Sequence, residues 1–189
     1  MKGEIYMTST SSVRANFIDT QNIIQTALLI AVLLAAAWML YSAPRQVSAD
    51  PCLLASVANA LVALCLWATR KTGLRGINLE RYLLAAFLLG MPLIYLARYL
   101  VSTGATASFW LWVEVLGLVV FATLALLGVR RSAWFLVIGI ALHGIAWDFW
   151  HYESSAYIPS WYAFGCAAVD IALAAYVVTR VREYRKVSG

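Results

Sequence analysis

The chain has 189 residues, of which 63% are hydrophobic and 12% are charged, and its formal net charge is +5. A soluble domain is about half apolar and about a quarter charged, so a compact soluble fold of this length has too little interior for so much apolar surface. The composition therefore excludes a soluble enzyme, and the basic charge is not accompanied by any phosphate-binding loop or basic–aromatic motif of a nucleic-acid-binding protein.

Apolar runs of about 20 residues, the length needed to cross a bilayer, recur along the chain. Helix is the expected structure, because lipid offers no water to unpaired backbone groups and the runs lack a period of two. We predict an all-α, polytopic bundle of six helices in one membrane domain, 22–182, between a polar segment, 1–21, and a basic tail, 183–189. The helices are expected near 22–42, 51–70, 81–102, 107–129, 132–151 and 159–181.

Lysines and arginines gather in alternate connections and at the C-terminus. Basic connections stay on the cytoplasmic side of a membrane, so both termini are predicted to be cytoplasmic, in the cell inner membrane, and the turn between the last two helices is predicted to face outward. The basic positions are Arg70, Lys71, Arg75, Arg81, Arg130, Arg131, Arg180, Arg182, Arg185 and Lys186.

The stretch from His143 to Asp170, "HGIAWDFWHYESSAYIPSWYAFGCAAVD", contains both histidines of the chain. His143, Trp147 and His151 follow one another at intervals of four residues, which places them on one stripe of a regular helix, with Asp148 beside the stripe.

Tyr162, Cys166 and Asp170 have the same spacing on the next helix. Because the two helices are antiparallel, His143 and Asp170 are expected at one level, about 12 Å below the outer surface. A lone charge in hydrocarbon costs several kcal/mol, so we predict that these two side chains pair.

Further polar groups occupy the outer half of the other helices. Glu114 lies about two turns into the fourth helix, Arg98 about one turn into the third, and Asn59 midway along the second. We expect a pocket that opens outward and has His143 and Asp170 at its floor. The predicted catalytic groups are His143, Asp148, Asp170 and Glu114, and the predicted substrate-binding residues are Asn59, Arg98, Trp147, His151, Trp161 and Tyr162.

Structural interpretations compete with these assignments. The polar network would then only hold the helices together, Asn59 would form an interhelical hydrogen bond, and Arg98 would extend to the membrane surface. Asp148, His151 and Glu153 would form a solvated helix end.

Three functions fit this sequence. The first is transport of a cation, proton or small solute, for which a homodimer would help to form two gates. The second is an intramembrane enzyme acting on a lipophilic substrate, with Asp170 or Glu114 as general acid and His143 as base. The third is a non-catalytic subunit of a larger membrane complex. The expected partners are the lipid bilayer and one such ligand, and nucleic acid is excluded.

We predict no cofactor. A metal ion would have its best ligands in His143, Asp170 and Glu114, but the pattern HxxxxDxxH is not a strong metal signature. In a regular helix His143 and His151 are two turns, about 12 Å, apart, which prevents both from binding one ion.

Overall fold

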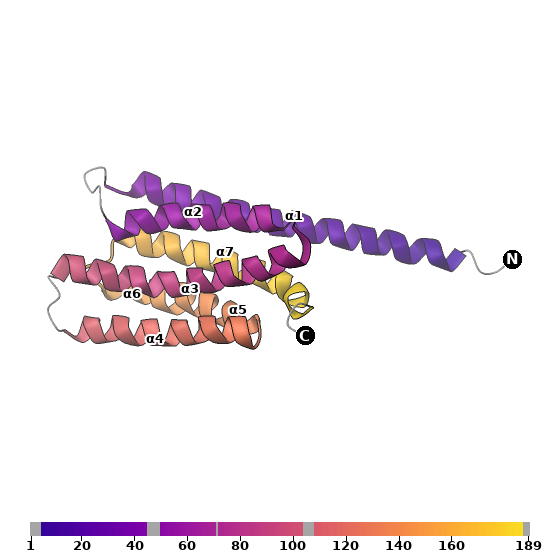
Figure 1. Cartoon of the computed structure of the whole chain (residues 1–189). Coiled ribbons are helices and arrows are strands. Elements are labelled where there is room, and N and C mark those ends of the chain that lie inside the picture. Colours follow the sequence, from indigo (N-terminus) through magenta and orange to yellow (C-terminus); the bar gives the residue numbers. More distant parts are fainter. Residues whose placement is uncertain (1–4, 45–49, 71, 104–107, 187–189) are drawn as a thin grey trace.

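The computed structural model describes residues 5–44, 50–70, 72–103 and 108–186, with the backbone alone for 5–19 and 74. All of its regular elements are helical (Figure 1). They are α1 (Ile5–Ser42), α2 (Pro51–Thr69), α3 (Gly73–Thr103), α4 (Phe109–Arg130), α5 (Trp134–Leu142), the π-helical turn η1 (His143–Asp148), α6 (Phe149–Ser154) and α7 (Ser160–Arg185).

The predicted all-α membrane bundle is confirmed. Within the described residues, five helices are long and apolar enough to cross a bilayer. The fifth predicted helix is the continuous run of α5, η1 and α6, which lies against α4 and α7 and is divided by the π-helical turn. The five spans are Thr20–Ser42, Pro51–Thr69, Arg75–Thr103, Phe109–Arg130 and Ser160–Arg185.

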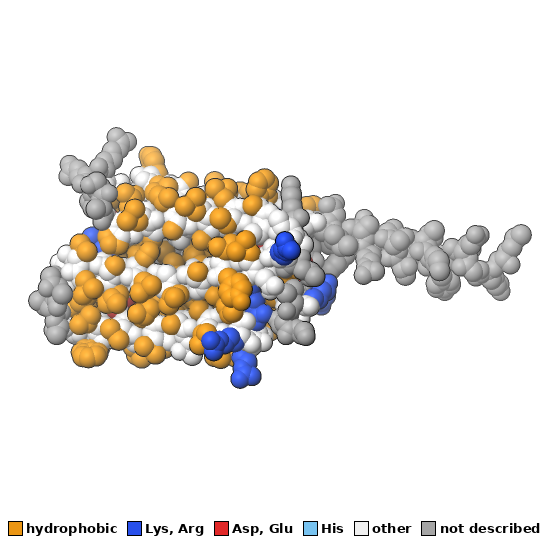
Figure 2. Space-filling model, viewed as in Figure 1, with side chains coloured by type: hydrophobic (Ala, Val, Ile, Leu, Met, Phe, Trp, Pro, Cys, Tyr) orange, Lys and Arg blue, Asp and Glu red, His pale blue; other side chains and the backbone are white. Residues whose placement is uncertain are grey.

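The surface of the bundle matches a lipid environment. Apolar side chains cover the flank seen in Figure 2, and most of the lysines and arginines in view gather near one end. We call this end, where α7 finishes and Arg130 and Arg131 lie, the basic end. The opposite end, which carries the connection between α6 and α7, is called the Tyr157 end.

Helix α7 forms the centre of the bundle. It packs against α1, α5, η1 and α6. Of the residues in its apolar 18-residue segment 67% are buried, against 28% in the corresponding segment of α1. Small residues allow the neighbours to come close: a Cβ atom on Gly165 would lie 2.1 Å from Cγ of Met39 on α1. Asp170, which is 0% exposed on α7, therefore faces other helices rather than lipid, which is how small-residue interfaces position polar groups in membranes.

Two helices begin earlier than the sequence indicated. Helix α1 starts at Ile5, and its first part extends beyond the other helices (Figure 1). Helix α3 starts at Gly73, whose φ of 66° suits glycine at a turn. Gly76, which the sequence placed in the connection, lies inside α3, where a Cβ would be 2.2 Å from the carbonyl oxygen of Thr69.

Candidate functional site

The π-helical turn decides which side chains of the fifth helix point inward. In an α-helix, residues five apart diverge by about 140° around the axis. In a π-helix, hydrogen bonds run from residue i to i+5, so residues five apart lie close to one face. His143 and Asp148 are the first and last residues of η1, and both side chains are fully buried.

Because of this turn, the predicted inward-facing stripe of His143, Trp147 and His151 is wrong. Trp147 does not share an inward stripe with His143 and His151; it is half-buried and lines a lateral groove of about 370 Å³ between the fourth and fifth helices. Asp148 takes the inward position instead, and His151 follows it three residues later, also 0% exposed.

His143, Asp148 and Asp170 form what we call the acid–His cluster. Nδ1 of His143 lies 2.8 Å from Oδ2 of Asp170 and 3.2 Å from Oδ1 of Asp148. The predicted pairing of His143 with Asp170 is thus confirmed, and Asp148 joins it. Gly144 makes the approach possible, because a Cβ there would lie 2.6 Å from Cβ of Asp170.

The acid–His cluster contains polar atoms with unused bonding capacity. Within the described residues, Nε2 of His143, Oδ2 of Asp148 and Oδ1 of Asp170 are buried and have no hydrogen-bond partner. A buried polar atom without a partner costs about 1–3 kcal/mol, and more when it is charged. Two carboxylates in such a place need compensating positive charge.

A second group, the Glu114 cluster, lies between the acid–His cluster and the Tyr157 end. Nε2 of His151 is 2.7 Å from Oε1 of Glu114, and the hydroxyl of Tyr157 donates to the same oxygen. Nδ1 of His151 faces the carbonyl oxygen of Trp147 at 2.9 Å, so this nitrogen carries a proton and donates.

Tyr157 lies in the connection between α6 and α7 and is buried. Burial, together with the hydrogen bond to Glu114, raises the pKa of its hydroxyl above the usual value. The hydroxyl therefore stays protonated and remains a donor to the Glu114 carboxylate.

These contacts rule out two alternative arrangements that the sequence allowed. Asp148 and His151 do not form a solvated helix end, since both are 0% exposed, whereas Glu153 is exposed. The metal trio of His143, Asp170 and Glu114 does not assemble either. Glu114 pairs with His151, and the π-helical turn supplies Asp148 to His143 in its place.

Tyr95 on α3 connects the two clusters and was missed in the sequence. Its hydroxyl donates to Oδ1 of Asp148 at 2.6 Å. Its ring lies edge-on to both imidazoles, 4.7 Å from His151 and 5.6 Å from His143. Tyrosine is abundant in this chain and common at membrane interfaces, so nothing in its sequence context distinguished it.

A cavity of about 510 Å³ opens at the Tyr157 end. Trp110 and Tyr157 line it, and both rings also contact His151, at centroid distances of 5.7 and 6.1 Å. The floor of this cavity is therefore in contact with the Glu114 cluster.

Arg98 lies at the rim of the same cavity and not within either cluster. Its Nη1 is 3.3 Å from Oδ2 of Asp50, the residue that caps α2, and its Nε donates to the carbonyl oxygen of Tyr157 at 3.1 Å. Arg98 thus ties the start of α2 to the connection between α6 and α7.

The other predicted substrate-binding residues have different surroundings. Tyr162 is buried, 5.9 Å from the ring of Tyr95, and Trp161 is half-buried against Tyr162. Asn59 is buried on α2, and its Nδ2 has no hydrogen-bond partner among the described residues. The interhelical hydrogen bond considered for Asn59 is therefore not formed by this nitrogen.

The predicted outward opening to the acid–His cluster is closed in this conformation. His143, Asp148 and Asp170 are each 0% exposed, and the rings of Tyr95 and Phe121 pack on His143 at 5.6 and 4.8 Å. Toward the basic end the cluster is followed by an apolar layer of fully buried side chains. These are Leu84, Leu88, Leu136, Ile140, Leu173 and Val177.

A third buried polar group lies beyond this layer, at the basic end. Nε and Nη2 of Arg180 donate to the two carboxylate oxygens of Glu80, each at 2.9 Å, and the hydroxyl of Tyr184 donates to Glu80 at 3.1 Å. The sequence placed Glu80 in a connection and Arg180 among the basic residues of the C-terminus, so this pair was missed.

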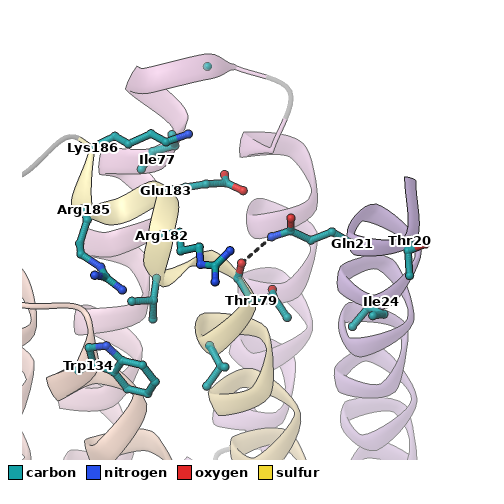
Figure 3. Close-up of a pocket in the computed structure, with 13 residues that line it drawn as sticks. Thr20, Gln21, Ile24, Ile77, Trp134, Thr179, Arg182, Glu183, Arg185 and Lys186 are labelled. Carbon is teal, nitrogen blue, oxygen red and sulfur yellow. Dashed lines mark hydrogen bonds between the residues drawn. The ribbon is translucent and has the colours of Figure 1, made fainter. Parts of the chain in front are cut away.

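A cavity of about 940 Å³ adjoins the basic end (Figure 3). Gln21 of α1 donates to the carbonyl oxygen of Thr179 across it at 2.7 Å, and Arg182 and Arg185 of α7 lie around it. None of the site residues predicted from the sequence lines this cavity, so we treat it as separate from the acid–His cluster.

The acid–His cluster and the Glu114 cluster together hold three carboxyl groups and two imidazoles away from water. Ionisable groups buried in a membrane are a common feature of ion and proton pathways and of acid–base sites, and they also pair with one another to hold helices together. Comparison of the chain with protein-family models, with curated proteins and with solved structures finds no match.

Proposed function

We propose that this multi-pass membrane protein binds a cation in the acid–His cluster and moves it across the bilayer. The observation that carries the proposal is an unbroken line of contacting, buried polar side chains. It runs from the cavity at the Tyr157 end through the Glu114 cluster and Tyr95 to Asp170. Ionisable residues inside a membrane typically mark the pathways of ions and protons.

The line ends well inside the bilayer. Asp170 is ten residues into α7, about 15 Å from the start of that helix. Among the described residues, the layer beyond it toward Glu80 and Arg180 is apolar except for the buried hydroxyl of Tyr176, which has no hydrogen-bond partner. The conformation is thus closed toward the basic end, and passage of a cation requires the helices to rearrange around the cluster, as in transporters with alternating access.

The direction of entry follows from charge. The preference of basic connections for the cytoplasmic side supports an orientation with the basic end inside and the Tyr157 end outside, and we propose the inner membrane of the cell as its location. A cation then enters through the outward cavity, where the charge of Arg98 is compensated by Asp50 at 3.3 Å.

The test is cation flux into liposomes that contain the purified full-length chain. Internal dyes report H⁺, Na⁺ and divalent ions in separate experiments. We expect flux of one of these ions, and loss of that flux in Asp170→Asn, which keeps the shape of the side chain but removes its charge. Glu153→Gln is the matched control, because Glu153 is an exposed acid near the same end. Flux that is absent from the native protein, or equal in Asp170→Asn, contradicts the proposal.

One observation favours a second candidate, an enzyme acting on a lipophilic substrate. The lateral groove of about 370 Å³ is lined by Phe121, Trp147 and Trp150 and faces the lipid. Phe121 also contacts His143, with ring centroids 4.8 Å apart. A substrate in this groove is one aromatic ring away from the imidazole. Turnover of a lipid by the purified protein, lost in His143→Ala, would support this candidate over transport.

A further inference from the structure

We infer that the acid–His cluster is a binding site for a divalent first-row transition-metal ion, with Nδ1 of His143 and the carboxylates of Asp148 and Asp170 as ligands. The inference rests on the proposed function, because it names the class of cation that the protein binds and moves.

The geometry suits such an ion. The three candidate ligand atoms all lie within 4.8 Å of one another, and Nδ1 of His143 is 2.8 and 3.2 Å from the two carboxylates. Zinc binds imidazole nitrogen and carboxylate oxygen at about 2.0–2.2 Å, which puts ligand atoms of a tetrahedral centre about 3.4 Å apart. Shifts of a few tenths of an ångström in His143 and Asp170 therefore make room for the ion.

Charge and unused bonding capacity point the same way. The carboxylates of Asp148 and Asp170 carry two negative charges when ionised, and a divalent ion compensates both, whereas a monovalent ion leaves one buried charge unpaired. Oδ2 of Asp148 and Oδ1 of Asp170 are fully buried and have no partner among the described residues. Both atoms therefore have capacity for a further bond.

The ligand set selects among divalent ions. Calcium and magnesium prefer an all-oxygen shell, while an imidazole with carboxylates suits zinc, manganese, iron or cobalt. Ligating side chains are usually oriented by a second hydrogen bond. Tyr95 provides one for Asp148, with its hydroxyl 2.6 Å from Oδ1.

The π-helical turn supplies the missing ligand. With the α-helical spacing assumed from the sequence, Asp148 would diverge from His143 by about 140°. In η1 both side chains are buried and offer ligand atoms within 4.8 Å of one from Asp170. Gly144 lets the backbone of the fifth helix lie against α7, where a Cβ would be 2.6 Å from Cβ of Asp170. π-Helical turns occur often at functional sites.

The experiment is a Co²⁺ titration of the full-length protein in detergent, after treatment with a chelator and its removal. Visible absorption of bound Co²⁺ reports nitrogen and oxygen ligation, and Zn²⁺ is added as competitor. We expect one Co²⁺ per chain, displaced by Zn²⁺, and no such binding by Asp148→Asn or Asp170→Asn. Glu153→Gln is the control and binds as the native protein does. Tyr95→Phe, which alters only the orientation of Asp148, is expected to weaken binding about 10- to 100-fold.

Helicity and elution volume show whether each variant is folded. If an asparagine variant does not fold, Asp170→Glu is used; it keeps the carboxylate and is expected to bind Co²⁺ more weakly than the native protein. The inference is overturned if the native protein binds no Co²⁺ or Zn²⁺, or if the folded asparagine variants bind them equally well. Metal binding without flux contradicts the transport proposal alone, and flux of Na⁺ or H⁺ without metal binding contradicts the metal inference alone.

Discussion

Replacing Gly144 by alanine tests whether the fifth helix and α7 are as close as the site requires. The new Cβ would lie 2.6 Å from Cβ of Asp170 and 3.2 Å from the carbonyl oxygen of Ala167. Carbon atoms in contact prefer about 3.5–4.0 Å, so at least about 0.9 Å of overlap must be relieved. Neither contacting atom is the tip of a flexible side chain, so the helices have to separate, at a cost of about 1–3 kcal/mol.

Gly90→Ala is the matched control. Gly90 also lies inside a helix, and no atom would lie within 4 Å of its added Cβ. Both variants gain helix propensity, so the difference between them isolates the overlap at Gly144.

Thermal unfolding in detergent measures this difference. We expect Gly144→Ala to unfold at a lower temperature than Gly90→Ala, by about 2–4 °C for each kcal/mol. Co²⁺ binding is expected to weaken as well, because separation of the helices lengthens the 2.8 Å contact between His143 and Asp170. Equal stability and equal Co²⁺ affinity of the two variants would refute the close approach.

Two further predictions concern buried contacts outside the acid–His cluster. Arg180→Met leaves Glu80, which is 0% exposed, without its cation, so unfolding assays are expected to show a loss of about 3–5 kcal/mol in the free energy of unfolding. The double variant Glu80→Gln/Arg180→Met is expected to lose less stability, because it leaves no unpaired charge. A double variant as unstable as the single one would argue against an ion pair. Gly117→Ala brings a Cβ to 2.4 Å from Cζ2 of Trp147, so a loss of about 1–3 kcal/mol is expected, and native stability in that variant would show that the Trp147 ring moves freely into the lateral groove.

The helices and one half of the site could be predicted from the sequence. Apolar runs of about 20 residues have one structural solution in lipid, which is why the six helices were found. His143 and Asp170 could be paired because antiparallel neighbours joined by a short connection have a fixed relative level. Each side chain also needed a partner in hydrocarbon.

The rest of the site depends on features that spacing does not reveal. Sequence reasoning assumes 3.6 residues per turn, so it put Trp147 on the inward face and Asp148 beside it. The π-helical turn exchanges these two roles. The partner of Glu114 could not be predicted either, because the relative rotation of two helices is set by packing.

Neutral and boundary residues were harder still to recognise. Tyr95 has a charge-free side chain in an apolar run, and its role depends on contacts with three residues from the fifth helix. Glu80 and Arg180 lie at helix ends, where charged residues are ordinary, and 100 positions apart in sequence. Their burial depends on the packing of α3 against α7, which the sequence does not reveal.

The central position of α7 has a consequence for how the protein is made. Translation produces α7 after the other helices, yet α1, α5 and η1 all pack against it. While the nascent chain ends before Ser160, the helices already inserted in the bilayer contain His143 and Asp148 but lack Asp170. Insertion and assembly are therefore separate events in time, because a chain that stops before α7 lacks both Asp170, the closest partner of His143, and the helix against which α1, α5 and η1 pack.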